Sequence, residues 1–330
     1  MSGGARGTAV LLRPEESADA AAAVVELLGA REYPGDPTWR EAVLRSAREA
    51  IEARPSRARI LVRADGTPLA LIVPEPLPDP RLGHRIWVGV ARPDVTTSEL
   101  TAGWDALAAA PDHVERVLRL YLDPPSSDPE PFDRSLTSLG FVRRWRMDLV
   151  IDPRAFAPAP PTGSAATPRG LTLDDEAALA TLMARAYDDD PAERATQAQS
   201  AEPADDARRG THDLLHGGVG TWCPEASFGV DDGDRLVGAT LVQEYQGLLI
   251  SEIMVDPSAR RRGLASRLLA ATLRALAARS VPSVRLVVTR ENERAYRLYR
   301  KLGFVANPGV EGPVWVRPDL VGSLADAAPV

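Results

Sequence analysis

A strand-like run, a glycine-containing loop and a long helix follow one another over residues 254–266, which read MVDPSARRRGLAS. Gly263 permits a close backbone approach, and the loop opens directly into a helix that starts near Leu264. The first amides of a helix lack helical partners and lie at the positive end of its dipole, so they suit phosphate oxygens. The segment has neither GK[ST] nor the three-glycine spacing of a dinucleotide fingerprint. We therefore expect a phosphate-binding site that is neither a GK[ST] loop nor a dinucleotide fingerprint.

A second chemistry-bearing run lies over residues 292–304, which read NERAYRLYRKLGF. Its pattern predicts a helix from about Glu291 to Leu302 that is stopped by Gly303. Tyr299 follows Asn292 by seven residues, or two helical turns, so both side chains fall on one face. That face therefore presents an amide and a phenol.

Together the two runs resemble the motifs of the GCN5-related N-acetyltransferases, the GNAT superfamily. R-x-x-G-x-A over residues 260–265, preceded by V-x-P, resembles the pyrophosphate loop of that family. N-x-x-A-x-x-x-Y-x-x-x-G-F over residues 292–304 resembles its second motif. The resemblance covers roughly residue 170 to the C-terminus. It implies that acetyl-CoA is the co-substrate and that an acetyl group passes to a primary amine by direct attack.

The resemblance also implies which residues hold acetyl-CoA between two central parallel strands that splay apart. The backbone of the first strand would pair with the pantetheine, the helix amides would hold the pyrophosphate with arginines at the rim, and an asparagine would act from the next loop. The predicted cofactor-binding residues are Ile253, Met254, Val255, Arg260, Arg261, Arg262, Gly263, Leu264, Ala265, Ser266 and Asn292.

Acyl transfer to an amine needs an oxyanion donor, a proton for the departing thiolate and a base. By resemblance, a main-chain N–H of residues 253–255 is the oxyanion donor and the Tyr299 hydroxyl is the proton source, with Tyr296 as second choice. Some relatives carry a base five residues before the asparagine, but Val287 occupies that position here.

Two other carboxylates are candidates for the base. Glu252, acting directly or through water, is our first choice, and Glu244 on the preceding strand is the second. An ordinary strand carboxylate facing solvent is an equal alternative for each. A competing function is a non-catalytic acyl-CoA-binding or partner-binding protein, which Val287 favours and the retained Asn292 and Tyr299 oppose.

His212 and His216 stand four residues apart in THDLLHGG and would share a helix face. Such a pair can bind a metal, but the sequence offers no evident third ligand, so we expect no metal site. Contact with the acceptor is the favoured role for this segment, because the resemblance implies that helices before the first hairpin shape the acceptor pocket.

The elements around these motifs predict an α/β class with a mixed α+β sheet. Residues 188–210 are polar and predict a mobile surface loop, with a short helix or a substrate lid as alternatives. The expected helices lie at residues 174–187, 264–279 and 291–302, and the expected strands at 226–230, 236–245, 248–255 and 284–288.

A length of 330 residues predicts two domains. We expect a GNAT-like domain over residues 1–151, a Pro/Ala-rich linker over 152–169 and the catalytic GNAT domain over 170–330. Each domain should hold a mixed β-sheet flanked by helices, in a tandem layout similar to that of the mycothiol synthase family.

The first domain repeats this layout but lacks the chemistry. Aligning LGF at residues 139–141 with LGF at 302–304 places Pro129 at the Asn292 position and Leu136 at the Tyr299 position. The corresponding loop, residues 91–98, contains no glycine. We expect this half to support the active half or to wall its acceptor pocket, and not to bind acetyl-CoA productively.

The composition of the chain limits the kinds of partner that it is expected to bind. The net charge of −7 argues against a nucleic-acid binder, and no apolar run is long enough for a membrane span. A single cysteine, Cys223, excludes an internal disulfide and, with no evident signal peptide, suggests the cytoplasm. The acceptor is expected to be a small-molecule or peptide amine; a thiol precursor, a peptide N-terminus and an amine antibiotic all stay open, as does the oligomeric state.

Overall fold

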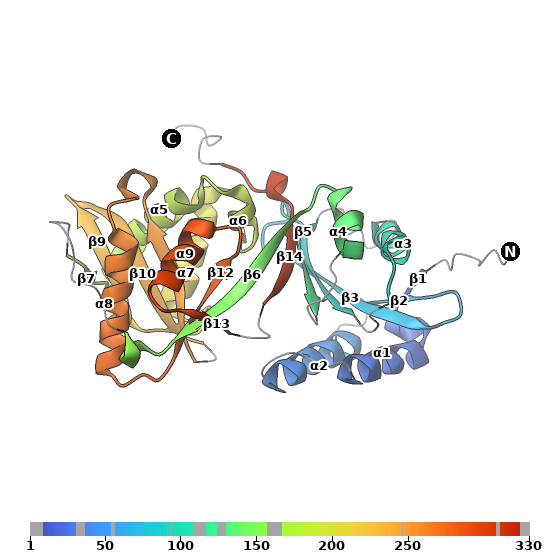
Figure 1. Ribbon diagram of the computed structural model, residues 1–330. Coiled ribbons are helices and arrows are strands. Elements are labelled where there is room, and N and C mark those ends of the chain that lie inside the picture. Colours follow the sequence, from blue (N-terminus) through green and yellow to red (C-terminus); the bar gives the residue numbers. More distant parts are fainter. Residues whose placement is uncertain are drawn as a thin grey trace. The chain divides into compact units, whose positions relative to one another are not determined.

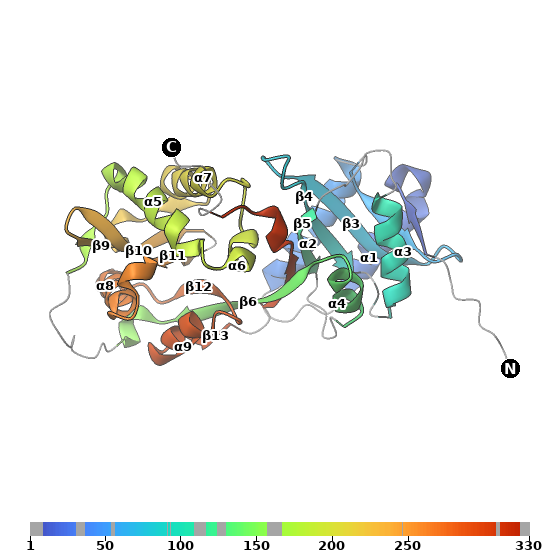
Figure 2. The same cartoon turned by 90° about the horizontal axis from the view of Figure 1, so that it is seen from above.

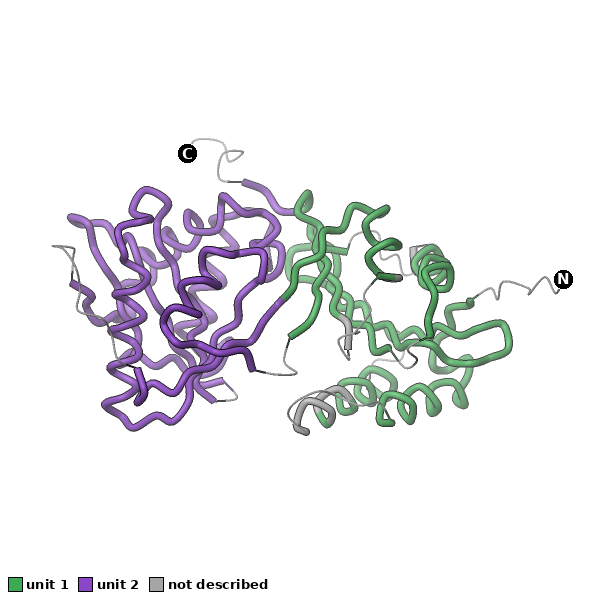
Figure 3. Tube along the Cα trace, viewed as in Figure 1, with its two compact units in different colours: residues 1–145, 308–320 green, residues 146–307, 321–330 purple. Residues whose placement is uncertain are grey.

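The computed structural model describes residues 9–30, 37–53, 57–90, 92, 94–108, 117–123, 130–156, 167–245, 247–307 and 311–323. Two compact units make up the chain (Figure 3). Unit 1 contains Met1–Trp145 and Pro308–Leu320, and unit 2 contains Arg146–Asn307 and Val321–Val330. Both units carry a mixed sheet with helices on its faces, which confirms the predicted fold class.

Among its described residues, unit 1 holds a sheet of six strands in which β4 and β5 form the one parallel pair. Alternate strand residues feed two separate cores, because successive side chains of a strand point to opposite faces. Figure 1 shows α1 and α2 on one face and α3 and α4 on the other. In sheet order the strands are β1 (Val10–Leu12), β2 (Arg59–Val62), β3 (Pro68–Pro76), β4 (His84–Val90), β5 (Val117–Asp123) and β14 (Gly312–Val316); the helices are α1 (Ala18–Ala30), α2 (Pro37–Glu52), α3 (Thr97–Ala108) and α4 (Glu130–Thr137).

Unit 2 is built the same way around the parallel pair β11–β12. Figure 2 shows α5 and α7 on one side of its sheet and α8 and α9 on the other. In sheet order the strands are β6 (Val142–Ile151), β12 (Val284–Thr289), β11 (Leu248–Val255), β10 (Arg235–Glu244), β9 (Phe228–Asp232) and β7 (Arg169–Gly170), with β13 (Val305–Ala306) on β6 and β8 (Thr221–Trp222) on β10; the helices are α5 (Glu176–Tyr187), α6 (Pro191–Ala195), α7 (Pro203–His216), α8 (Leu264–Ala278) and α9 (Glu293–Lys301).

Each unit contains a strand that belongs, by sequence, to the other half of the chain. Residues 146–151 of β6 pair with β12 in unit 2, and β14 pairs with β5 in unit 1. In both cases the strand covers the open edge of a parallel pair, which would otherwise leave backbone donors and acceptors unpaired. The units therefore do not follow the chain in the simple order of residues 1–151 and 170–330.

Residues 188–210, expected to form a mobile surface loop, hold two helices instead, so that prediction is wrong. α6 fits the short-helix alternative, and α7 buries Ala207, Leu214 and Leu215 against the sheet. Pro203 stands in the first turn of α7, and Gly217 closes it in the left-handed conformation (φ 91°). This segment is part of the core of unit 2.

The exchanged strand β14 generates a stability prediction. Trp315 is fully buried in the core of unit 1, where its ring lies 5.9 Å from that of Phe132 and its Nε1 donates to Asp133 at 2.8 Å. We expect Trp315→Ala to lower the free energy of unfolding of unit 1 by about 3–5 kcal/mol because it leaves a large cavity.

Urea unfolding measures the loss in Trp315→Ala, and hydrogen exchange with mass spectrometry locates it. Trp315→Phe serves as the matched control and should lose less, because it keeps an aromatic ring in the core. Faster exchange confined to unit 2 would contradict the assignment of β14 to unit 1.

Candidate functional site

The parallel pairing of β11 with β12 stops halfway along the two strands. The pairs Leu249–Arg285 and Ile250–Leu286 are in register, and residues 251–255 of β11 have no partner on β12. β12 continues to Thr289 but pairs with β6 on its other side. One edge of β11 is thus open where the strands diverge.

A β-bulge in β11 accompanies this divergence. Val242 of β10 faces Ile250 and Leu241 faces Glu252, so Ser251 is the extra residue. Its hydroxyl donates to the carbonyl oxygen of Leu241 at 3.2 Å. Because a bulge bends its strand and re-aims the following side chains, it accounts for the turn of β11 away from β12.

The open edge leads, through a 3-10 turn at Pro257–Ala259, to the start of α8. Gly263 has φ +77°, a conformation that glycine adopts without strain, and the first helical bond runs from Arg267 N–H to Gly263 O at 3.2 Å. The amides of residues 263–266 have no acceptor among the residues that the structure describes. Four backbone donors therefore stand together at the positive end of a 15-residue helix.

The three arginines of the loop differ in what they contact. Arg260 forms an ion pair with Asp189 and donates from Nη2 to the carbonyl oxygen of Ala186 at 2.8 Å. Arg262 lies 3.3 Å from Asp232. Arg261 is exposed, has a positive φ of 65°, and no partner for its side chain is found in the described part of the chain. Of these three arginines, Arg261 therefore has the side chain that can bind an added anion without breaking an ion pair.

A cavity of about 400 Å³ opens where β11 and β12 diverge, and it is lined by residues 249–253 and 286–289. Asn292 and Tyr299 of α9 line it as well, whereas Tyr296 does not. The Asn292 side-chain oxygen also caps α9 by accepting from Ala295 N–H at 3.2 Å. Asn292 and Tyr299 therefore lie on one side of α9, as their spacing predicts, and this side borders the cavity.

Glu252 is the buried carboxylate of this cavity. It is only 6% exposed and accepts a hydrogen bond of 2.5 Å from the hydroxyl of Tyr187, at the end of α5. Burial raises the pKa of Glu252 to about 7, although the Tyr187 hydrogen bond and the charge of Arg146 act in the opposite direction. A carboxylate with this pKa can take up and release a proton near neutral pH.

Burial also raises the pKa of Tyr299, and the negative charge of Glu252 adds to the effect. Its hydroxyl therefore keeps its proton at neutral pH. Tyr299 is 7% exposed, and its ring lies 5.9 Å from that of Phe304. A protonated phenol and a titratable carboxylate share one cavity.

Sequence reasoning missed three residues of the cavity. Arg146 of β6 donates to Glu193 of α6 at 2.8 Å and to Thr289 of β12 at 2.7 Å. The second oxygen of Glu193, Oε2, is buried without a hydrogen-bond partner in the described part of the chain. Tyr187 is the third. Two of these elements were not expected here, since β6 belongs to the first half by sequence and α6 lies in the predicted loop.

Other predicted residues lie elsewhere. Glu244 is exposed at the far end of β10, paired with Leu248, and does not line the cavity. Met254 points into the core between the sheet and α5 and α7, so only its backbone is available to a ligand. His212 and His216 do not line the cavity either, although Gly210 and Leu214 of the same helix do.

Unit 1 lacks the divergence seen in unit 2. There the parallel pair β4–β5 is paired from His84–Val117 to Gly89–Asp123, with one register shift between His84 and Arg85 and constant register from Arg85–Arg119 onward. Leu136, at the position matching Tyr299, is 1% exposed and belongs to the core. Pro129 and parts of the loop 91–98 lie outside the described residues. Continuous pairing leaves no open edge on β4 along this ladder.

Comparisons with known proteins agree with this geometry. Residues 184–304 match the family described as Acetyltransferase (GNAT) family. This match lies within unit 2 and takes in the cavity strands, α8 and α9, so this part of the chain is similar to GNAT acetyltransferases. A GCN5-related N-acetyltransferase from Sphaerobacter thermophilus has the same fold, with a TM-score of 0.56 at 20% identity over 93% of this chain and 94% of that one. The likeness extends over both units, so the chain is a two-domain GNAT-fold protein.

A curated relative is more similar in sequence over a shorter stretch. The mycothiol acetyltransferase of Acidimicrobium ferrooxidans (strain DSM 10331 / JCM 15462 / NBRC 103882 / ICP) is 37% identical over 105 residues. The match covers 30% of this chain and spans about a third of that protein, 34% of its length. Among the described residues of the present chain, no helix is both long and apolar enough to cross a membrane.

The buried carboxylate generates a prediction about stability. The folded pKa of about 7 lies above the ordinary value of 4.5, so between these values the folded protein binds this proton more tightly than the unfolded chain does. Stability from this group is therefore full below pH 4.5 and is lost as pH rises through 7. We expect Glu252→Gln, which cannot ionise, to gain up to about 3 kcal/mol relative to wild type between pH 5 and 8.5.

Urea unfolding of Glu252→Gln and wild type at several pH values measures this difference. Glu244→Gln removes an exposed carboxylate from the neighbouring strand and is the control. If the difference between Glu252→Gln and wild type does not change with pH, the carboxyl is not titrating in the folded protein as described.

Proposed function

We propose that unit 2 transfers an acetyl group from acetyl-CoA to a primary amine in the cavity between β11 and β12. The observation that carries this proposal is the interrupted pairing of β11 with β12, which opens a strand edge beside the free amides of α8 and a cavity holding Glu252 and Tyr299. Acetyl-CoA supplies a thioester, a chain of amides and a diphosphate. The residues present offer a matching contact for each.

The diphosphate would lie against the amides of residues 263–266, with the Arg261 side chain adding charge. Arg260 would act indirectly, because its Nε donates to the carbonyl oxygen of Val255 at 3.3 Å and so fixes the end of the strand. The amide chain would pair with the open edge at Ile253 and Val255 as an added strand does. Asn292 would use its amide NH₂, since its oxygen caps α9.

The amine would arrive protonated and would need to lose a proton before it attacks. Glu252 is placed to accept that proton, directly or through water, since its pKa lies close to neutral. The unpaired Oε2 of Glu193 gives the same cavity a second carboxylate oxygen that can accept a hydrogen bond from an ammonium group. Glu244 is too far along β10 to serve as the base.

The amine nitrogen then forms the new bond to the thioester carbon while the bond to sulfur breaks. A main-chain N–H of residues 253–255 would hold the carbonyl oxygen as its negative charge grows. Tyr299 would give its proton to the departing thiolate. The second proton, which leaves the attacking nitrogen as the amide forms, would pass directly or through water to the tyrosinate and restore it, and Glu252 would release the first proton to solvent. Val287, at the position where some relatives carry a base, leaves Glu252 as the carboxylate for the first step.

The curated relative suggests one class of acceptor but does not identify the compound. The mycothiol acetyltransferase of A. ferrooxidans acts, by its name, on a thiol compound, and an amino-bearing thiol precursor is therefore one candidate for this chain. A peptide N-terminus or another small amine fits the cavity chemistry equally. The cytoplasmic location suggested by the single cysteine stays a prediction.

The exchange of strands gives the N-terminal half of the sequence a defined part in this proposal. Arg146, which precedes the predicted linker, supplies a guanidinium to the cavity from β6. With its own strands paired continuously, unit 1 would not bind acetyl-CoA. We propose that it acts as a scaffold.

Removal of the Tyr299 hydroxyl tests the proposed acid. We expect Tyr299→Phe to lower kcat by roughly 10- to 1,000-fold with little change in CoA affinity, because the thiolate loses its proton donor. Thiol release from acetyl-CoA with a panel of amines measures the rate. Tyr296→Phe, one helical turn away and outside the cavity, is the comparison and should keep its rate.

Equal rates for Tyr299→Phe and wild type would remove Tyr299 from the mechanism. CoA binding by wild type without thiol release from any amine in the panel would favour the non-catalytic acyl-CoA-binding function instead.

The phosphate loop is tested by Gly263→Glu. The substitution places a side chain at φ +77° and a negative charge beside the helix amides, so we expect CoA binding to be abolished. Gly247→Glu is a matched control: Gly247 has φ +90°, and a Cβ there would also meet no atom within 4 Å. Calorimetry that finds similar CoA affinity in the two variants would contradict the assigned loop.

A further inference from the structure

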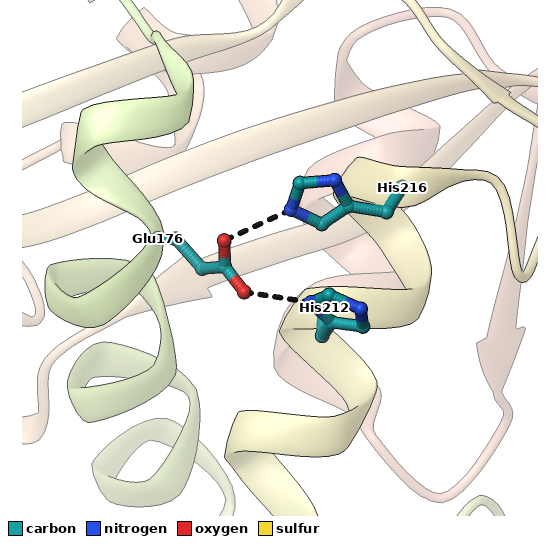
Figure 4. Close-up of side chains that lie close together, drawn as sticks. All are labelled: Glu176, His212 and His216. Carbon is teal, nitrogen blue, oxygen red and sulfur yellow. Dashed lines mark hydrogen bonds and ion pairs between the residues drawn. The ribbon is translucent and has the colours of Figure 1, made fainter.

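Two histidines and a glutamate meet on the outer surface of unit 2, away from the cavity (Figure 4). His212 and His216 stand one turn apart near the end of α7, and Glu176 begins α5. His212 Nδ1 lies 3.0 Å from Glu176 Oε1, and His216 Nε2 lies 3.0 Å from Glu176 Oε2. The two imidazole rings are 4.4 Å apart between centroids. The carboxylate thus bridges both rings.

We propose that Glu176, His212 and His216 form a binding site for a divalent transition-metal ion, Zn²⁺ being the best fit. Two imidazole nitrogens and a carboxylate oxygen are a ligand set that zinc favours. One atom from each residue can be chosen so that all lie within 4.8 Å of one another. Ligand atoms around a tetrahedral zinc with bonds of about 2.0–2.2 Å stand roughly 3.3 Å apart, so small side-chain rotations suffice.

The helix geometry preorganises the two histidines. Residues four apart on a helix face the same side, and Gly217 ends α7 immediately after His216. α5 packs along α7, and this contact brings the first turn of α5 to the last turn of α7. Because three ligands come from two packed helices, the protein does not need to reorganise its backbone around the ion.

The exposure of the three side chains leaves room for a fourth ligand. The side chains of His212, His216 and Glu176 are 59%, 40% and 36% exposed. Water can therefore complete the tetrahedron from the solvent side.

The site would be structural and not catalytic. None of its three ligands lines the cavity, whereas Met183 and Tyr187 of α5 and Gly210 and Leu214 of α7 do. An ion bound to both helices would fix the two elements that form one wall of that cavity. The main effect of metal is then expected on the stability of unit 2.

The test uses the untagged full-length chain, because a polyhistidine tag would bind the same ions. After treatment with a chelator and dialysis, Co²⁺ is titrated while its visible absorption is recorded, and Zn²⁺ is then added to displace it. We expect one Co²⁺ per chain with the absorption of a tetrahedral site, displacement by Zn²⁺, and a higher Tm in Zn²⁺ than in chelator.

Variants locate the ion. We expect His212→Ala and Glu176→Gln each to weaken Zn²⁺ binding at least about tenfold and to lose the rise in Tm. Asp174→Asn removes an exposed carboxylate two residues before Glu176, and Arg209→Ala shortens an exposed side chain on α7; both controls should bind as wild type does. Far-ultraviolet circular dichroism of each variant confirms that it folds.

Two results would overturn the proposal. One is the absence of Co²⁺ or Zn²⁺ binding by wild type up to millimolar metal. The other is binding that His212→Ala and Glu176→Gln leave unchanged, which would place the ion elsewhere. For a variant that fails to fold, anomalous diffraction at the zinc edge from wild-type crystals gives the answer, since the peak either lies between these three side chains or does not.

Discussion

Interrupted hydrogen bonding between two parallel strands is the constraint on which the candidate site depends. A buried strand edge normally pairs along its length, because unpaired backbone groups are costly. In unit 2 the bulge at Ser251 ends the pairing after Ile250, and β12 satisfies its other edge with β6. The free-energy cost of the unpaired backbone groups of β11 is offset only if another set of hydrogen-bonding groups pairs with this strand. The comparison with β4–β5, which pair continuously in unit 1, shows that the fold itself does not require this opening.

The same divergence sets the chemistry of the cavity. Glu252 follows the bulge and turns into a buried environment that it shares with Tyr187 and Tyr299. Burial disfavours the charged form of each group, so the carboxyl titrates near neutral pH and both phenols keep their protons. A carboxyl that titrates near neutral pH and two protonated phenols thus have one physical cause, the removal of water.

The exchanged strands link the two halves of the chain within each sheet. β6 covers the edge of β12 in unit 2 and carries Arg146 into the cavity, while β14 completes the sheet and core of unit 1 through Trp315. Neither unit would keep a covered sheet edge if its half of the chain were produced alone. The half without the expected acetyl-CoA motifs thus supplies an edge strand to the half that has them.

Sequence alone determined the elements and motifs whose signals are local. The periodicity of α8, the turn at Gly263 and the spacing of Asn292 and Tyr299 depend on residues close together in the chain, and each is found where it was expected. The helix α7 was missed, and a short helix such as α6 stood only as an alternative, because the polar composition of this segment outweighed the cues of Pro203 and Gly217.

Only the tertiary structure decided which carboxylate lies in the cavity, which strand completes each sheet and which loop arginine has no partner among the described residues. Glu252 and Glu244 look alike in sequence, and the bulge and the packing of α5 separate them. The third member of the histidine cluster, Glu176, stands 36 residues before His212 and meets it only because α5 packs on α7. Contacts of this kind join residues that are distant in the chain, and local sequence patterns carry no record of them.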